Sequence, residues 1–179
     1  MKSLTPVETA DTSDCGATGM VNEDPEPVIR YEAPMSPGIS LLGGFRVVDG
    51  KGENITGSFT PILRHMLILV ILYTERNGEG ISNTLLKDCL WPDKSDESFL
   101  NNRSVNMRKL RVLLPEIGEL RLGVSHGNWS LETADCQLVD YFAVMSAARA
   151  ITEKGYGTGY RRVRRLLDYI SRGPLLPEC

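Results

Sequence analysis

The stretch from residue 60 to residue 78 restricts the fold more than any other part of the chain. Thr60-Pro61 is a typical helix start and Asn77-Gly78 is a typical helix end. Between these ends, apolar residues lie around almost the whole circumference, at Ile62, Leu63, Met66, Leu67, Leu69, Val70 and Leu72. Because such a helix has no broad polar face to turn to solvent, the sequence predicts a central helix that other elements surround.

The residues before this helix predict a charged leader and two short strands. Residues 1–37 contain repeated prolines and carry a net charge of −5, whereas the rest of the chain carries +2. We expect this leader to be disordered, or to be a linker, because it lacks apolar periodicity. Residues 39–48 predict a strand with a bend at Gly43-Gly44, and residues 55–59 predict a second short strand.

Two further helices are expected after the central one. Ser82 is placed to cap a short helix over residues 83–91, and a longer helix is expected over residues 98–114. The longer helix contains four basic residues and no acid. Its spacing predicts an inner face with Leu100, Met107, Leu110 and Leu114. Its outer face carries Asn101, Val105, Arg108 and Val112, with Asn102 and Lys109 at one edge.

The last third of the chain predicts a hairpin and two helices. Residues 120–124 and 129–131 alternate in polarity around a polar turn, which is typical of a β-hairpin. Helices are expected over residues 136–154 and 160–172. The last of them carries Val163, Leu166, Leu167 and Ile170 on one face. We expect this apolar face to cover the rest of the chain or to meet another chain.

Several motifs in this order resemble the bacterial OmpR-type winged helix. They include Leu90-Trp91-Pro92 and Val105-Asn106-Met107-Arg108-Lys109-Leu110-Arg111. The resemblance is closer to the version in the SARP-type activators. It implies an α+β fold in which residues 38–133 form a winged helix-turn-helix with N-terminal strands and a C-terminal β-hairpin wing. In that family the helix at 98–114 is the recognition helix, which enters the DNA major groove.

The resemblance continues beyond the hairpin. Residues 139–149 and 172–176 are similar to the start of the bacterial transcriptional activator domain, which is a tetratricopeptide-like helical array. Residues 134–179 are therefore expected to be its first helical pair. Because the family has several such pairs, we expect a truncated chain or a piece of a longer regulator.

The resemblance also implies the DNA-binding residues. On the helix and at the hairpin turn these are Asn101, Asn102, Val105, Asn106, Arg108, Lys109, Arg111, Ser125 and His126. Arg108 is expected at a guanine edge, Val105 at a thymine methyl group and Lys109 at a phosphate. The alternatives are a merely solvated helix face and capping roles for Asn101 and Asn102. A second basic cluster is expected to be the polar face of an amphipathic helix, with a DNA contact as the alternative, at Arg161, Arg162, Arg164 and Arg165.

Other classes of function find no support in the sequence. The four cysteines are far apart and there are two histidines, so neither a metal cluster nor a disulfide framework is expected. No catalytic motif is present, and the longest apolar run is far shorter than a membrane span. We expect a cytoplasmic protein, or the cytoplasmic part of a longer one, that is not an enzyme and needs no cofactor or small-molecule substrate.

The predicted function is a DNA-binding transcriptional regulator, with activation favoured over repression. Its predicted partners are double-stranded DNA, RNA polymerase and a second copy of the chain. The alternative is a protein–protein interaction module built on a winged helix that has lost its DNA affinity. The turn at residues 125–127 lacks the arginine often found there in the family, which keeps this alternative open.

Overall fold

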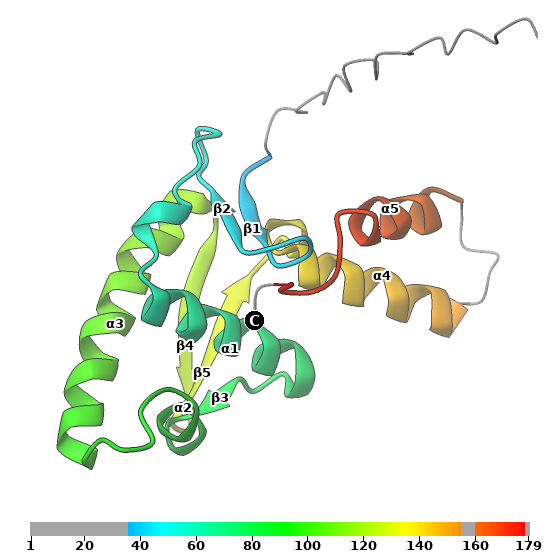
Figure 1. Ribbon diagram of the computed structural model, residues 1–179. Helices are drawn as coiled ribbons and strands as arrows, with labels where there is room; N and C mark the ends of the chain where they lie inside the picture. Colours follow the sequence, from blue (N-terminus) through cyan, green and yellow to red (C-terminus); the bar gives the residue numbers. More distant parts are fainter. Residues whose placement is uncertain (1–35, 155–159, 178–179) are drawn as a thin grey trace, which may run out of the picture. The chain divides into compact units, whose positions relative to one another are not determined.

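The computed structural model describes residues 36–154 and 160–177, so nearly all of the predicted leader lies outside the described residues. Within this part of the chain, five α-helices accompany two small antiparallel sheets (Figure 1). The predicted α+β class is therefore confirmed. The helices and strands pack around one hydrophobic core that extends from β1 to α4.

The N-terminal strand is split in two at the glycine pair. Strands β1 (Gly38–Ser40) and β2 (Arg46–Val48) pair antiparallel, with Ile39 opposite Val47. The bend expected at Gly43-Gly44 is a complete reversal of the chain. Gly43 has a φ of 74°, and a Cβ there would lie 2.2 Å from the carbonyl oxygen of Arg172. Glycine is required at this position by both its conformation and its close neighbour.

The prediction of a second strand over residues 55–59 is wrong. A single bridge joins Val48 to Asn54, and the chain then forms the 3₁₀ helix η1 (Thr56–Ser58). The Asn54 side chain accepts a hydrogen bond from the Thr56 amide at 3.0 Å, and Thr56 Oγ1 accepts one from the Val47 amide at 2.9 Å. These local side-chain bonds replace the ladder bonds that a strand needs.

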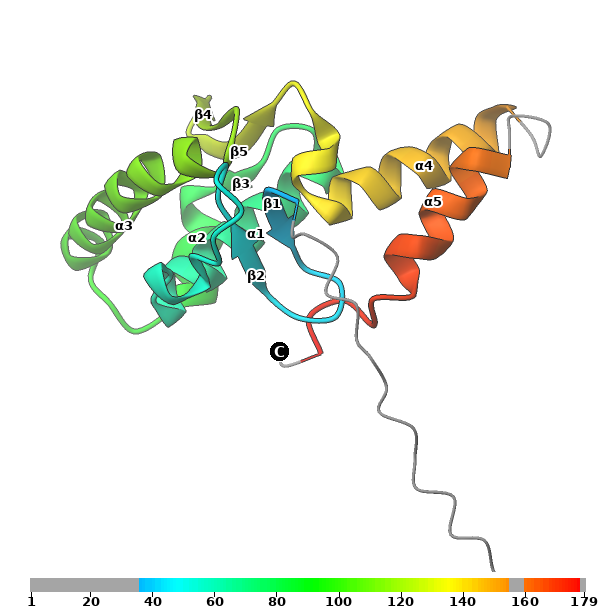
Figure 2. The ribbon, with the colours of Figure 1, turned by 90° about the horizontal axis from the view of Figure 1, so that it is seen from above.

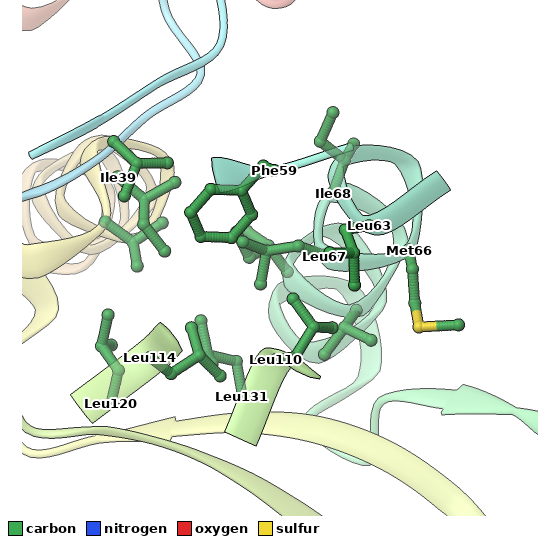
Figure 3. Close-up of a cluster of buried hydrophobic side chains, with 14 of the residues drawn as sticks. Ile39, Phe59, Leu63, Met66, Leu67, Ile68, Leu110, Leu114, Leu120 and Leu131 are labelled. Carbon is green, nitrogen blue, oxygen red and sulfur yellow. The ribbon is translucent and has the colours of Figure 1, made fainter. Parts of the chain in front are cut away.

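The central helix is confirmed as α1 (Pro61–Asn77), with Gly78 as its left-handed C-cap. Thr60 is the N-cap, and its carbonyl accepts a hydrogen bond from the Arg64 amide at 2.9 Å, but its side chain makes no capping bond. Pro61 then occupies the first helical position. Its buried residues are Leu63, Met66, Leu67, Ile68, Val70 and Ile71. Figure 3 shows several of these side chains facing Leu110, Leu114 and Leu131 across the core.

The second and third helices lie where they were predicted, but the third is longer than predicted. α2 (Asn83–Leu90) begins at Ser82, whose side chain accepts a hydrogen bond from the Leu85 amide. α3 (Asp96–Ile117) is longer at both ends than the predicted 98–114. It continues past Pro115, which is exposed and lies in the last turn, where its missing amide costs the helix one backbone hydrogen bond.

The predicted hairpin is confirmed as β4 (Leu120–Ser125) and β5 (Asn128–Thr133). A third strand, β3 (Ile81–Ser82), pairs with β5 and completes a sheet of order β3-β5-β4. In this sheet Ile81 lies opposite Trp129, and Leu122 lies opposite Leu131. The strand β3 was not predicted, because two residues are too few to show the alternation of apolar and polar side chains that identifies a strand in a sequence.

The C-terminal helices pack beside the N-terminal hairpin. The predicted helix over 136–154 is broken at Val139, so that η2 (Cys136–Leu138) precedes α4 (Asp140–Lys154). Val139 is extended because it bridges Ile39 in parallel and is fully buried in the core. α5 (Tyr160–Ile170) runs back beside α4, as both ribbon views show (Figure 1, Figure 2).

Residues on both sides of the predicted boundary at 133/134 therefore share one core, and the division into two domains stays a prediction. Arg149 of α4 also forms an ion pair with Glu75 of α1. After α5, the Leu176 amide donates to the Leu41 carbonyl at 2.9 Å, and the Gly43 amide donates to Pro174. The C-terminal segment is thus tied to the reversal between β1 and β2.

Asp140 is the polar group that joins these two parts, and it is 2 % exposed. Its carboxylate accepts hydrogen bonds from the amides of Leu41 at 2.8 Å and Leu42 at 3.1 Å. Burial raises the pKa of Asp140 above its ordinary value of 3.8, and the two amides offset only part of this rise.

We expect Asp140→Asn to lower the free energy of unfolding by about 1–3 kcal/mol, because an amide cannot accept from both backbone donors. The raised pKa means that the folded state holds the Asp140 proton more tightly, so its contribution is present at low pH and is lost as the pH rises through that pKa. The free-energy gap between wild type and variant, measured by urea unfolding, should therefore widen as the pH is lowered from neutral toward the ordinary carboxyl pKa of 3.8. A gap that narrows on acidification would contradict this direction.

Candidate nucleic-acid interface

The inner face of α3 fixes its orientation on the core. Met107, Leu110 and Leu114 are buried against it, as predicted. Leu100 is not, since it is 45 % exposed, and the prediction that it belongs to the core is wrong. At this end of α3 the inward position belongs to Phe99, which packs edge-on against Trp91 with ring centroids 5.8 Å apart.

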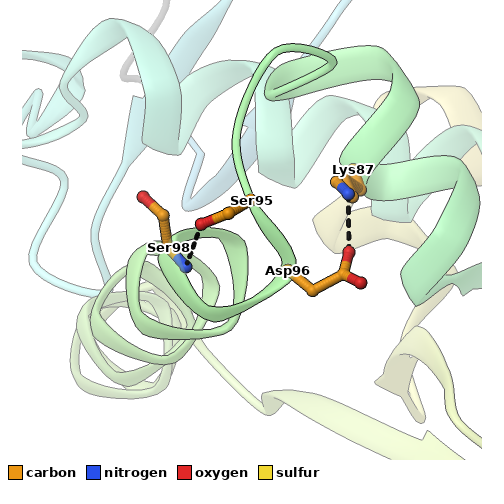
Figure 4. Close-up of polar contacts among 4 residues, drawn as sticks. All are labelled: Lys87, Ser95, Asp96 and Ser98. Atoms are coloured by element: carbon orange, nitrogen blue, oxygen red, sulfur yellow. Dashed lines mark hydrogen bonds and ion pairs between the residues drawn. The ribbon is translucent and has the colours of Figure 1, made fainter.

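The start of α3 is held by two polar contacts (Figure 4). Ser95 is the N-cap, and its side chain accepts a hydrogen bond from the Ser98 amide at 3.3 Å. Lys87 of α2 donates to Asp96 at 2.6 Å, and this contact lowers the pKa of Asp96. Because Asp96 is exposed, the ion pair contributes little to the stability of the fold, and its main effect is to link the end of α2 to the start of α3.

The outer face of α3 presents a mixed basic and apolar stripe. Asn101, Arg108 and Lys109 are exposed, and two valines stand between and beyond them with 55 % of Val105 and 64 % of Val112 exposed. A groove of about 450 Å³ borders the stripe on the side of η1 and the start of α1. Its lining residues are Ser58, Thr60, Leu63, Arg108, Lys109, Val112 and Leu113. The stripe offers cationic donors and apolar surface together.

The two inner asparagines have their amide groups engaged within the helix. Asn102 donates from Nδ2 to the Ser98 carbonyl, and Asn106 donates to the Asn102 carbonyl, each at 2.8 Å. Asn106 is also buried, at 7 % exposure. Of the predicted contacts on α3, Asn106 is therefore the one that the structure separates from the exposed stripe.

Arg111 lies at the edge of α3 nearest the hairpin. Its side chain is exposed, and its guanidinium carbon lies 5.5 Å from the centre of the Trp129 ring on β5. α3 and the hairpin are therefore in contact through this pair.

The hairpin turn brings Ser125 and His126 to its tip. His126 and Gly127 have φ values of 50° and 81°, as the turn of a two-residue hairpin requires. Ser125 Oγ lies 3.0 Å from His126 Nδ1, and both residues are exposed. These two predicted contacts are thus accessible, and they bring no permanent charge to the tip.

The second basic cluster lies on α5. Arg161, Arg164 and Arg165 are exposed, and the side chain of Arg162 lies outside the described residues. On the apolar face, Val163, Leu167 and Ile170 are 37 %, 58 % and 52 % exposed, and Leu166 is half-buried. The apolar face is therefore largely open in a single chain, and its contact with another chain stays a prediction.

Other kinds of site receive no support from the described residues. None of their His, Cys, Asp and Glu side chains form a group of three that could hold a metal ion. Among the helices of residues 36–154 and 160–177, none has both the length and the apolar character needed to cross a lipid bilayer.

Comparison with known proteins identifies a similar fold. No family model matches the chain, and no curated protein matches it either. Among solved structures, EmbR from Mycobacterium tuberculosis, in complex with a low-affinity phosphopeptide, superposes with a TM-score of 0.56 at 18 % identity. The matched part of the chain shares its fold with the corresponding part of EmbR. The match covers 78 % of this chain but spans only 37 % of the EmbR chain.

At 18 % identity, the likeness to EmbR assigns no individual residue.

The contact between Arg103 and Trp129 was not predicted, because the two residues come from different elements. The sequence held one sign of this contact, because Arg103 lies near the edge of the inner face of its helix, where an apolar residue is more usual.

Proposed function

We propose that this chain is a sequence-specific DNA-binding transcriptional regulator of the SARP type. In this proposal α3 enters the major groove and the β4–β5 hairpin lies beside it as the wing of a winged helix. The observation that carries the proposal is the exposed stripe of Val105, Arg108, Lys109 and Val112 on a helix whose other face is buried. Exposed valines beside cationic side chains are better suited to a DNA groove than to water, because the valines can contact thymine methyl groups and the cations can contact base edges and phosphates.

Each residue of the stripe has a role in this proposal. Arg108 donates to a guanine edge, Val105 contacts a thymine methyl group, and Lys109 binds a phosphate. Asn101 and Arg111 bind phosphates at the two edges of the groove, and Ser125 and His126 approach the neighbouring backbone. We do not carry forward the DNA contact predicted for Asn106, because its side chain is buried and its amide is engaged with the Asn102 carbonyl.

The likeness of fold to EmbR supports this assignment. An activating role, binding as a dimer and contact with RNA polymerase are further parts of the proposal. The test is enrichment of duplexes from a random-sequence library by the purified chain, followed by affinity measurements at several salt concentrations. Enrichment of one motif with a steep salt dependence is expected.

Lys109→Ala should weaken binding to all duplexes alike and lower the slope of log K against log salt by roughly 1. The reason is that an exposed lysine at a phosphate releases a counterion without reading the base sequence. Fluorescence anisotropy with a random duplex at several salt concentrations measures this slope.

The matched control is Arg165→Ala on α5, which should change neither the affinity nor the slope. If Arg165→Ala lowers the slope and Lys109→Ala leaves it unchanged, the DNA-binding surface lies on α5 and our assignment to α3 is wrong.

A second candidate function is a protein-interaction module. The open apolar face of α5, with Leu167 58 % and Ile170 52 % exposed, favours it. This candidate replaces the first if the wild-type chain binds no duplex at low salt.

A further inference from the structure

Arg103 differs from Arg108 and Lys109 because it turns inward toward the hairpin. Its guanidinium carbon lies 5.6 Å from the centre of the Trp129 ring and 5.7 Å from that of Phe99. Its Nε atom is enclosed and has no hydrogen-bond partner within the described part of the chain. A guanidinium placed in this way is directed to the protein and away from a DNA strand.

One side-chain oxygen joins three elements at this point. Asn83, the first residue of α2, accepts hydrogen bonds on Oδ1 from Arg103 Nη1 of α3 and from Trp129 Nε1 of β5, each at 2.8 Å. Trp129 is also paired with Ile81 of β3. The amide oxygen of Asn83 therefore sets α2, α3 and the sheet in one arrangement.

A second contact holds α3 to the same ring. Arg111 lies 5.5 Å from the centre of the Trp129 ring and follows Arg103 by about two helical turns. Two contacts separated along the helix resist both rotation of α3 and tilting of α3 against the hairpin.

We propose that Arg103, Asn83 and Trp129 are positioning residues that fix the angle between α3 and the β4–β5 hairpin. This inference rests on the proposed function, in which both elements must reach the same duplex. An apolar side chain at position 103 would pack on two aromatic rings without enclosing a guanidinium, so packing alone does not account for arginine there. Hydrogen bonds are directional, so they fix the orientation of α3 relative to the hairpin, whereas apolar contacts would allow that orientation to vary.

The first test is Arg103→Met, which keeps the length of the side chain and removes its donors. Affinity for the duplex enriched by the wild-type chain should fall roughly tenfold, the size expected for one charge-assisted hydrogen bond. The salt slope should stay unchanged, because Arg103 neutralises no phosphate. Unchanged affinity, or a slope lowered by about 1 as for a phosphate contact, would overturn the proposal.

The second test reaches the same contact from α2. Asn83→Ala should reduce affinity for the enriched duplex to a similar extent, and the double variant should lose little more than either single variant. Fully additive losses would show two independent effects and would overturn the proposal. Asn83→Asp retains the acceptor and should largely preserve the affinity.

The third test does not depend on DNA. Spin labels at Val105→Cys and Val124→Cys, both exposed positions, report the distance between α3 and the hairpin once the native cysteines are replaced by serine. Asn83→Ala should broaden this distance distribution, and an unchanged distribution would refute the positioning role. A wild-type chain that binds no duplex would refute the proposed function instead, while this measurement still decides the inference.

Discussion

Arg108→Ala is expected to lower the affinity for the enriched duplex by about 5- to 150-fold, which corresponds to about 1–3 kcal/mol. The expected loss is large because a bidentate guanidinium contact reads a base edge, and alanine supplies no substitute donor. Affinity for random duplexes should fall much less, so the ratio of specific to random affinity should also fall. Competition of the two duplexes for the variant in anisotropy measurements provides this ratio.

The fold should not change in this variant. Arg108 is exposed on α3, so the free energy of unfolding should move by less than about 0.5 kcal/mol. Arg165→Ala is again the control, since it removes the same charge from α5. Normal discrimination by Arg108→Ala would show that α3 does not read the base sequence.

Leu110→Ala should have the opposite profile and lower the free energy of unfolding by about 2–5 kcal/mol. Leu110 lies two residues from Arg108, about 200° around the helix, and its side chain is fully buried. Its removal leaves a cavity between α3 and the central helix, where Figure 3 shows it among the core side chains. Urea denaturation followed by circular dichroism measures the loss.

Val112→Ala is the matched control for this second variant. It shortens an apolar side chain on the same helix, but 64 % of Val112 is exposed, so the stability should change by less than about 0.5 kcal/mol. Equal destabilisation by Leu110→Ala and Val112→Ala would contradict the orientation of α3.

The elements that sequence reasoning predicted correctly depend on local chemistry. Pro61 and Gly78 delimit α1, and Ser82 begins α2, because caps and helix-compatible dihedrals act within a few residues. The hairpin turn likewise follows from residues 125–128 alone. For the same reason the exposed stripe on α3 could be predicted from helical periodicity.

The errors arise where a distant residue decides the local structure. Val139 interrupts a helical pattern because it bridges Ile39, a hundred positions earlier in the chain. Leu100 has the spacing of a core residue, but Phe99 occupies the inward place through its contact with Trp91. Arg103 could be recognised as unusual on its helix, but its partner Asn83 belongs to another helix.

The hydrogen bonds from Leu41 and Leu42 to Asp140 have a consequence for the order of folding during synthesis. The residues they join are 99 and 98 positions apart, and the amide of Leu176 later completes the same region. The region between β1 and β2 is synthesised first, but it can form these hydrogen bonds only after Asp140 and Leu176 have been synthesised. The contacts among α1, α2 and the hairpin can form earlier, so the nascent chain should acquire its candidate DNA-binding surface before its first strands are secured.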